Sequence, residues 1–450
     1  MKFDLTSLSK EIRNIRGSVY FLGIGGSGMF GVAMLAHEMG FSVCGTDSRA
    51  GKNTVRLASR AIPLYPEEEA LPQNISALVY SLAVRTDHPR MQEALSRGIP
   101  VFSRPEFFGE LMRAFPIRAA VAGSHGKSST TAMCAEILRQ AGFSPTVVSG
   151  ADLDCEGSFR RGEGDILLFE ACEYKDAFLS FSPTHALVLD VSWEHTDYFP
   201  DEESVMRSFF AFLHEETVCR SVAPCGLLSP DITFGKGGYY TAERVERMEG
   251  GNRFLLCCSG NIIGEVALHV EGNFQVENAL GAAALCFSLG VSHDAVLRGL
   301  SAYRGIARRM EKKGYLLGVP LYLDFAHHPK ELFCAIKTAE SIGRPVALVF
   351  EPHTYSRTQS FWKDFVLALR LPHKAGLLPI YAARERALSG VSSDLLAREA
   401  GIAFLPDYPC AANFLKEAAK EGCILLLVGA GSVEGVLSHL SLSTNEGLRC

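Results

Sequence analysis

The sequence lacks the features by which membrane, secreted and zinc-cluster proteins are recognised. No run approaches the roughly 20 consecutive apolar residues that a membrane-spanning helix needs. The opening stretch, MKFDLTSLSKEIRNIRG, carries acidic side chains and no apolar core, so it is not typical of a secretory signal peptide. The 13 cysteines form no CxxC pair and no zinc-ligand spacing, and their odd number suits a reducing compartment better than a disulfide framework. We therefore expect a cytoplasmic protein without a membrane partner.

Neither sign of charge dominates, and repeats and low-complexity tracts are absent. The chain has 44 basic and 50 acidic side chains, which gives a net charge of −6. This balance disfavours a nucleic-acid partner bound through global charge, although it allows a local anion site. With 450 residues, and at about 100–200 residues per domain, the chain should form two to four domains. We expect a monomer or a dimer.

Short apolar runs alternate with helical patterns in three successive segments. Strands of about five residues between amphipathic helices indicate parallel sheets built from βαβ units. The strand candidates are residues 19–23, 77–81 and 99–102, then 119–123, 166–170 and 186–191 with a hairpin at 253–257 and 265–270, and finally 321–324, 346–350, 377–381 and 424–428. The predicted fold class is α/β, with three domains at residues 1–115, 116–308 and 309–450.

A glycine-rich turn, GIGGSG at residues 23–28, follows the first predicted strand and precedes a helix predicted at 29–39. Glycines allow the backbone to approach a diphosphate, and a helix N-terminus offers free N–H groups and positive potential. A tight strand-to-helix turn without a ligand is the alternative. Asp47, at the end of the next strand, either holds a ribose hydroxyl or caps the strand. Taken alone, this pattern is typical of an NAD-dependent dehydrogenase.

A second glycine-rich turn, GSHGKSS at residues 123–129, lies between another strand and a helix predicted to end near Ala141. Consecutive N–H groups can wrap a phosphate there, while Lys127 can reach the β- and γ-phosphates and the Ser128 hydroxyl can bind Mg²⁺. The spacing is GxxGKS instead of GxxxxGKS, because Val121 stands where the first glycine is expected. A purely structural role hardly accounts for GKSSTT at this place, so the turn predicts binding of a nucleoside triphosphate.

Acidic residues and a histidine follow the neighbouring strands. Glu170 and Glu173 stand at the carboxyl end of a predicted buried strand, and His195 follows the next strand. Because this edge of an open α/β sheet faces the ligand, a carboxylate and a histidine could share Mg²⁺ with the phosphates. Each residue alone could also be a surface acid or a hydrogen-bonded histidine. Beside the GKS turn, the predicted metal ligands are Ser128, Glu173 and His195.

Nine segments, in order along the chain, resemble the motifs of the Mur ligase family. They are GIGGSGMFGVA at 23–33 with GTD at 45–47, AGSHGKSSTTAM at 122–133, EACEYKDAFL at 170–179, SWEHTDYF at 192–199, GNFQVENALGA at 272–282, GIARRME at 305–311, DFAHHPKEL at 324–332, PHTYSRT at 352–358 and GAGSV at 429–433. On these segments, which span nearly the whole chain, it is identified as a member of the family.

The resemblance implies an N-terminal Rossmann-like domain that binds a UDP-linked substrate, and a central P-loop ATPase domain with a mainly parallel sheet. It implies a C-terminal Rossmann-like domain that binds the amino acid and closes over ATP. It also implies a reaction in peptidoglycan synthesis, with ATP and Mg²⁺ as cofactors. MgATP would phosphorylate the lactyl carboxylate of UDP-N-acetylmuramate, and the amine of L-alanine would then attack the acyl phosphate.

Site residues carry over from the matching motifs. Catalysis would involve Lys127, Glu173, His195, His327 and Arg357. ATP would be bound by Gly123, Ser124, His125, Gly126, Lys127, Ser128, Ser129, Asn278, Arg309 and Asp324, and the UDP-linked substrate by Gly23, Gly25, Gly26, Ser27, Gly28, Asp47 and Ser81. The group that takes the proton from the amine stays open, because His327 or His328 could do so, bind substrate or have a structural role.

A few positions depart from the family pattern. Cys172 replaces an acid, which makes Glu173 a surer ligand than Glu170, while Phe325 replaces a tyrosine and Thr354 an arginine. One alternative is a ligase that attaches a whole tripeptide to UDP-N-acetylmuramate, and another is a nucleotide-binding protein without turnover. A dehydrogenase gives no reason for GKSSTT or for the pairing of Glu173 with His195.

Overall fold

The computed structural model describes residues 3–443 except residues 49, 86, 154–156, 196–197 and 384. The chain divides into two compact units. The first combines Met1–Val270 with Phe274–Ile306, and the second combines Glu271–Asn273 with Ala307–Cys450. The boundary predicted after residue 115 lies inside the first unit, and the predicted domain limits stay predictions.

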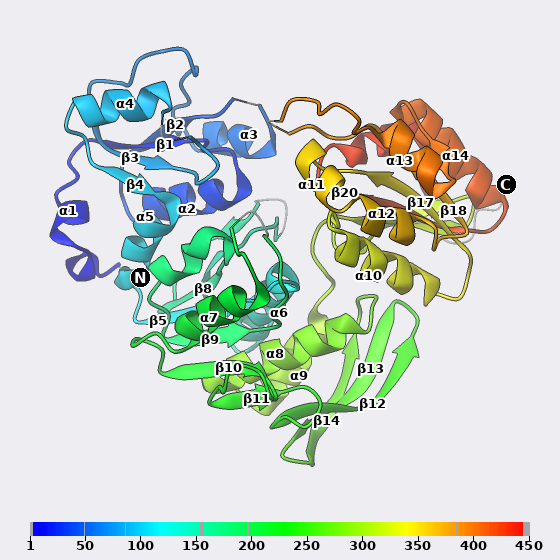
Figure 1. The fold of residues 1–450 in the computed structure, drawn as a ribbon. Coiled ribbons are helices and arrows are strands. Elements are labelled where there is room, and N and C mark those ends of the chain that lie inside the picture. The colour runs from blue at the N-terminus through cyan, green and yellow to red at the C-terminus, as the bar shows by residue number, and fades with distance from the viewer. Residues whose placement is uncertain are drawn as a thin grey trace. The chain divides into compact units, whose positions relative to one another are not determined.

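A four-stranded parallel sheet begins the first unit (Figure 1). Its strands, in spatial order, are β2 (Val43–Thr46), β1 (Ser18–Leu22), β3 (Ile75–Tyr80) and β4 (Val101–Ser103). The accompanying helices are η1 (Leu5–Ser7), α1 (Lys10–Arg13), α2 (Ser27–Glu38), α3 (Lys52–Ser59), α4 (Pro89–Ser96), α5 (Arg104–Leu111) and η2 (Met112–Ala114). All residues of β1 are buried, as expected for an inner strand of a parallel sheet.

A ten-stranded sheet forms the rest of the first unit. Its strands, in spatial order, are β14 (Asn261–Leu268), β13 (Gly251–Cys258), β12 (Tyr240–Met248), β11 (Ile232–Phe234), β10 (Arg220–Pro224), β9 (His185–Val188), β5 (Ile117–Ala122), β8 (Ile166–Glu170), β6 (Thr146–Val148) and β7 (Phe159–Arg160). The strands from β11 to β6 pair in parallel, whereas β12, β13 and β14 pair antiparallel. The helices are α6 (Lys127–Gln140), η3 (Tyr174–Ser180), α7 (Glu202–Leu213), α8 (Phe274–Ser288) and α9 (His293–Ala302).

Strand β5 shows that the ten-stranded sheet is covered on both faces. Ala119 and Val121 belong to a hydrophobic cluster with residues of α6, α8 and α9. Ala120 and Ala122 belong to another cluster, with residues of α5 and α7. Successive strand side chains point to opposite faces, so helices flank both sides of β5. This burial explains why four apolar residues follow one another in the strand.

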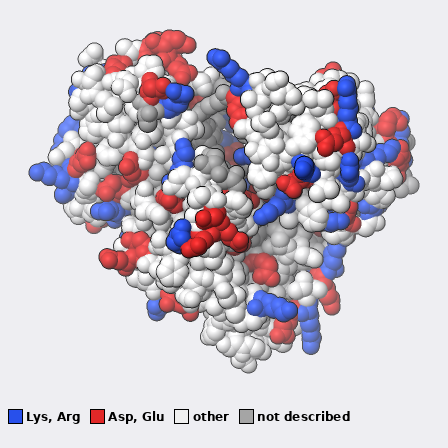
Figure 2. All heavy atoms as spheres, in the orientation of Figure 1, with Lys and Arg blue, Asp and Glu red and all other residues white. Residues whose placement is uncertain are grey.

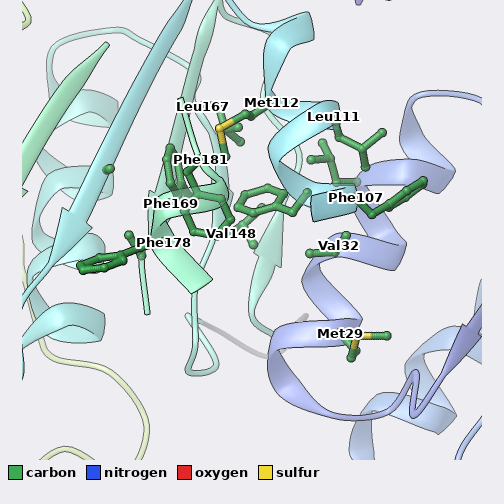
Figure 3. Close-up of a cluster of buried hydrophobic side chains, with 14 of the residues drawn as sticks. Met29, Val32, Phe107, Leu111, Met112, Val148, Leu167, Phe169, Phe178 and Phe181 are labelled. Carbon is green, nitrogen blue, oxygen red and sulfur yellow. The ribbon is translucent and has the colours of Figure 1, made fainter. Parts of the chain in front are cut away.

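The cluster with α5 and α7 extends into the four-stranded part of the unit. Figure 3 shows Val32 of α2 and Phe107 of α5 near Phe169 of β8 and Phe181. Phe108 meets Phe169 and Phe181 edge-on, with ring centroids 5.4 and 5.3 Å apart. The two sheets of the first unit therefore share one hydrophobic core.

A six-stranded sheet organises the second unit. Its strands, in spatial order, are β15 (Glu311–Leu316), β16 (Val319–Asp324), β20 (Ile424–Gly429), β17 (Val346–Glu351), β18 (Lys374–Leu377) and β19 (Ala403–Phe404). The pairs are parallel except β15–β16. The helices are α10 (Pro329–Glu340), α11 (Tyr355–Ser360), α12 (Trp362–Leu369), α13 (Ser393–Ala400), α14 (Tyr408–Lys420) and η4 (Val433–His439). Leu348 packs with α10, α12 and α13 while Val349 packs with α14 and η4, which is the layering of a doubly wound fold.

Charges of both signs are interspersed on the face that Figure 2 shows. Within the described part of the chain, no helix combines the length and the apolar character that crossing a bilayer requires.

The predicted α/β class is confirmed, and strand positions agree with two exceptions. Strand β8 coincides with residues 166–170, and β13 and β14 form the predicted hairpin. The strand predicted at 377–381 is wrong, because β18 ends at Leu377 and Pro379, which lacks an N–H group, follows. The strand predicted at 186–191 is too long, because β9 ends at Val188. Strand β12 is among the strands that were not predicted, since its middle residues are exposed and, apart from Val245, charged.

Candidate active site

Three neighbouring parallel strands end at one edge of the ten-stranded sheet. Strand β5 lies between β8 and β9 and pairs with both. The pairing continues beyond the strands, because Ala171 N donates to Val121 O at 2.9 Å and Leu189 N donates to Ala122 O at 3.0 Å. The carboxyl ends of parallel strands form the ligand edge of such a sheet. The segments that meet at this edge are residues 123–126, 171–173 and 189–195.

The GSHGKSS turn needs glycine at two positions. Gly123 has φ +141° and Gly126 has φ +78°, in the left-handed region that side chains disfavour. A Cβ on Gly123 would lie 3.0 Å from Oδ1 of Asp190. A Cβ on Gly126 would lie 2.4 Å from Oδ1 of Asn278, which α8 places over the turn. Gly126 is the N-cap of α6, and Ser129 is buried in that helix.

The side chains of the turn are tied to the segment that follows β9. Ser124 Oγ accepts the Ser192 N–H at 2.8 Å, and the His125 N–H donates to Asp190 Oδ1 at 2.8 Å. The His125 ring Nε2 lies 3.2 Å from Glu194 Oε1. Burial raises the pKa of Asp190 against the opposing influence of His125. These contacts fix the position of the turn relative to residues 190–194.

Lys127, the first residue of α6, forms a buried ion pair with Glu173. Its Nζ lies 2.9 Å from Glu173 Oε2, and the two side chains are 14% and 4% exposed. Burial alone would raise the pKa of Glu173, but the Lys127 charge and a hydrogen bond from His195 outweigh it and lower the pKa to about 2. Burial alone would lower the pKa of Lys127, but Glu173 holds it above its usual value. The edge therefore carries a fixed ammonium and a fixed carboxylate at neutral pH.

His195 also contacts the Glu173 carboxylate. Its Nε2 is 3.5 Å from Glu173 Oε1, and its ring centroid is 4.7 Å from that of Tyr174. The backbone of His195 has φ +52°, a conformation that costs a non-glycine residue about 1–3 kcal/mol and is concentrated at functional sites. The structure thus brings together Lys127, Glu173 and His195, as predicted from sequence.

The predicted metal ligands fall into two groups, because Ser128 lies beside Glu170 whereas Glu173 lies beside His195. Ser128 Oγ donates to Glu170 Oε2 at 2.8 Å, and the same oxygen accepts the Gly150 N–H at 2.8 Å. Glu170, which the sequence ranked below Glu173, therefore lies directly beside the turn. Hydroxyl and carboxylate oxygens are the hard ligands that Mg²⁺ prefers. The oxygens of Ser128 and Glu170 and, separately, the carboxylate of Glu173 are of the kind that fits this ion.

The GIGGSG turn connects β1 to α2. Gly23 has φ +84°, and a Cβ there would lie 4.0 Å from the Cβ of Ser81. Gly26 is the N-cap of α2. The Gly25 N–H donates to Asp47 Oδ2 at 2.9 Å. Asp47 therefore supports the turn itself, and its contact with a ribose stays a prediction.

The first turn of α2 has a cation beside it. The helix begins at Ser27, and Arg104 Nη1 lies 3.4 Å from the place that a Cβ on Gly28 would take. A helix N-terminus and a guanidinium both favour an anion. Arg104 was not among the predicted site residues.

The remaining predicted site residues lie in the second unit. The carboxylate of Asp324 is buried, and its two oxygens accept the N–H groups of Met310 and Ala326, each at 2.8 Å. Burial raises the pKa of Asp324. The Arg309 guanidinium lies 5.3 Å from the centre of the Phe325 ring. Asp324 thus holds residue 310 against the end of β16, and its contact with ATP stays a prediction.

His327 and Arg357 meet around His353. The His327 and His353 ring centroids are 5.9 Å apart, and Arg357 Nη1 donates to His353 Nδ1 at 3.3 Å. Tyr381 stacks on His353 at 5.5 Å. Burial and the Arg357 charge lower the pKa of His353 to about 4, and burial also lowers the pKa of His327 against the opposing charge of Glu331. Both pKa shifts favour the neutral form of the imidazole.

We expect His353 to make the protein less stable in mild acid. Its pKa falls from an ordinary value of 6.5 to about 4 on folding, so between these values the unfolded chain binds more protons. The stability contributed by the neutral ring is complete above pH 6.5 and is lost as the pH falls toward about 4. Thermal unfolding of the whole chain at about pH 5 and pH 7.5 should show a drop in Tm that His353→Asn reduces. An undiminished drop in His353→Asn would remove His353 as its source.

Sequence reasoning missed several residues at these sites. Asp190 closes a predicted strand and Glu194 precedes His195, so the strand-end rule could have found both. His353 stands in the PHTYSRT motif, which could have pointed to it. Arg104 carried no comparable signal, because only the folded chain brings it near the GIGGSG turn.

Known proteins match most of the chain. Residues 18–116 match the model of the Mur ligase family, catalytic domain, and residues 121–286 match that of the Mur ligase middle domain. A UDP-N-acetylmuramate–L-alanine ligase of Acetivibrio thermocellus is 35% identical over 438 residues, which cover 92% of this chain and 93% of that protein.

Solved structures share the fold over almost the full length. A UDP-N-acetylmuramate–alanine ligase of Thermotoga maritima superposes with a TM-score of 0.80 at 24% identity, covering 94% of this chain and 97% of the other. A murein peptide ligase of Psychrobacter arcticus superposes with a TM-score of 0.71 at 21% identity, covering 94% and 98%. On the two domain matches and the 35% identity that extends over 92% of its length, the chain belongs to the Mur ligase family.

Proposed function

We propose that this chain is an ATP-dependent ligase that joins L-alanine to UDP-N-acetylmuramate in peptidoglycan synthesis. The observation that carries the proposal is the meeting of a phosphate-binding turn with Lys127, Glu170 and Glu173 at one sheet edge. Its support is a relative that bears this ligase name and aligns over 92% of the chain. Phosphoryl transfer needs such positioned charges, whereas hydride transfer does not.

The reaction must turn a carboxylate into an electrophile. A carboxylate reacts poorly with nucleophiles because its charge repels them. An oxygen of the lactyl carboxylate attacks the γ-phosphorus of ATP, ADP leaves, and an acyl phosphate forms. The nitrogen of L-alanine then attacks the carbonyl carbon, its proton passes to a base, and phosphate leaves the tetrahedral intermediate to give the amide.

The chain contributes mainly positioning and charge. Lys127 would offset the repulsion between the carboxylate and the terminal phosphate of ATP, in a site where the ammonium is already fixed. Ser128, Glu170, Glu173 and His195 would hold Mg²⁺. When bound, that ion neutralises phosphate charge and orients the phosphate oxygens.

The other predicted roles belong to the same proposal. Residues 23–28 with Asp47 and Ser81 would bind the UDP group, and residues 123–129 would bind ATP with Asn278, Arg309 and Asp324. His327, neutral at pH 7 because its pKa is lowered by burial, is a suitable acceptor for the proton of the amine. The nucleotide substrates favour a cytoplasmic location, and a monomer or a dimer stays the expectation.

A phosphate-release screen tests the function. Purified chain would be given ATP, Mg²⁺ and UDP-N-acetylmuramate with L-alanine, glycine, L-serine or the L-alanyl-γ-D-glutamyl-diaminopimelate tripeptide. Release that requires the sugar nucleotide and is fastest with L-alanine supports the proposal. Preference for the tripeptide would instead support the recycling ligase, and release that depends on none of these amines would reject both.

Arg357→Ala should raise the KM for L-alanine by about tenfold, with a smaller change in the KM for ATP. The reason is that Arg357 holds His353 beside His327 and offers a guanidinium to the amino-acid carboxylate. Initial rates at varied L-alanine would measure it. Replacing the exposed Arg344 by alanine is the matched control, and an unchanged KM in Arg357→Ala would exclude this role.

A further inference from the structure

One segment between β6 and β7 contacts both glycine-rich turns. We name residues 149–153 and 157–158 the bridging segment; residues 154–156 lie outside the described part of the chain. Two backbone hydrogen bonds hold its arms together, from Ser149 N to Ser158 O and from Leu153 N to Gly157 O, each 2.9 Å. The segment begins directly after β6, at the ligand edge of the ten-stranded sheet.

At one end, the bridging segment holds Glu170 against the GSHGKSS turn. The Gly150 N–H donates to Glu170 Oε2 at 2.8 Å, and Ser149 Oγ lies 3.5 Å from the same oxygen. That oxygen also accepts the Ser128 hydroxyl at 2.8 Å. A Cβ at residue 150 would lie 2.7 Å from Glu170 Oε1, so a larger residue would push the carboxylate away. The position of Glu170 therefore depends on the position of this segment.

At the other end, the bridging segment is tied to the GIGGSG turn. Ser158 Oγ donates to Ser27 O at 3.0 Å. Asp152 accepts two hydrogen bonds from Arg56 of α3, with Nη1–Oδ1 at 3.2 Å and Nη2–Oδ2 at 3.0 Å. Arg56 Nη1 also donates to Asn53 Oδ1 at 2.8 Å, and Asn53 Nδ2 donates to Gly25 O at 3.0 Å.

The Arg56–Asp152 pair is better placed than an ordinary surface ion pair. Its side chains are 18% and 26% exposed, and a two-bond arginine–carboxylate contact fixes direction as well as distance. The guanidinium also packs on the backbone of Gly157, where a Cβ would lie 2.9 Å from Nη1. For comparison, Arg161 pairs with Glu38 of α2 at 2.6 Å, but Arg161 is 51% exposed and contacts neither turn.

We propose that Arg56 and Asp152 are positioning residues that couple the two nucleotide sites, so that a sugar nucleotide on the GIGGSG turn orders Glu170 and Ser128 for ATP. The path runs from Gly25 through Asn53, Arg56 and Asp152 to the bridging segment and on to Glu170. The naming of the two ligands depends on the proposed function. The coupling itself does not depend on turnover.

The test measures coupling by binding. Calorimetry on the whole chain would give the Kd for UDP-N-acetylmuramate with and without a non-hydrolysable ATP analogue and Mg²⁺. In the unaltered protein the analogue should tighten binding by at least about fivefold. Arg56→Ala and Asp152→Ala should each reduce this factor to below about twofold, and the double variant should match the single ones because they break one interaction.

Control variants separate positioning from general loss of structure. Arg161→Ala removes the other ion pair and should keep the full coupling factor, while Arg56→Lys, which keeps the charge but not the two-bond fork, should keep part of it. Asp152→Asn serves if either alanine variant unfolds early in thermal melts. The proposal is overturned by full coupling in Arg56→Ala, by equal loss in Arg161→Ala, or by no coupling in the unaltered protein. Coupling without L-alanine-dependent phosphate release would reject only the proposed function.

Discussion

Replacing Lys127 by alanine is expected to lower ATP-dependent phosphate release on the order of 10³-fold, the scale on which loss of one fixed charge or donor at a reacting group acts. The ammonium is held 2.9 Å from Glu173 and is bonded to the Ser124 carbonyl at 3.1 Å, so it is fixed beside the turn before substrates bind. Alanine removes the charge and leaves the backbone of α6 in place. Phosphate release at saturating ATP and UDP-N-acetylmuramate measures the loss.

The same change has a consequence for stability that must be separated from catalysis. Glu173 is 4% exposed, and without Lys127 its buried negative charge loses its neighbouring cation while it keeps the contact with His195. Breaking a buried pair costs about 3–5 kcal/mol. The double variant Lys127→Ala with Glu173→Gln removes both charges and should regain thermal stability without regaining activity. Near-normal phosphate release in Lys127→Ala would exclude the lysine from the mechanism.

The strand framework was predictable where apolar runs are short and bounded. Residues 166–170 form β8 as predicted, because the run is apolar and buried between β5 and β6. Strand β12 was not predictable in the same way, since its exposed residues carry no alternating apolar pattern and its pairing with β13 decides its structure. The shift of β18 to Lys374–Leu377 shows that an apolar run does not by itself determine where a strand ends.

At the site, the sequence predicted contacts that follow from sheet topology. Lys127, Glu173 and His195 meet because β5, β8 and β9 are neighbours. Contacts that depend on tertiary packing could not be predicted in this way. Glu170 was ranked low because a cysteine follows two residues later in its motif, yet Gly150 holds its carboxylate on Ser128. The Arg56–Asp152 pair joins residues 96 positions apart, and no local sequence pattern predicts such a pair.

Replacing Gly126 by alanine is expected to lower phosphate release on the order of 10²-fold, although alanine adds only one methyl group. Gly126 has φ +78°, and the new Cβ would lie 2.4 Å from Asn278 Oδ1, so either the buried Asn278 side chain or the turn must shift. The N–H groups that face a bound phosphate would move with the turn. The KM for ATP and the rate of phosphate release measure the effect together.

Gly142, just beyond the other end of α6, is the matched control. It has φ +83°, and a Cβ there would meet nothing within 4 Å. Both alanine variants are therefore destabilised by a similar backbone strain of about 1–2 kcal/mol, which urea unfolding would measure. Only Gly126→Ala also displaces Asn278. If Gly142→Ala lost as much activity as Gly126→Ala, strain on the helix and not the clash would be the cause. A loss confined to Gly126→Ala would instead establish that the fit between this glycine and Asn278 sets the shape of the phosphate-binding turn.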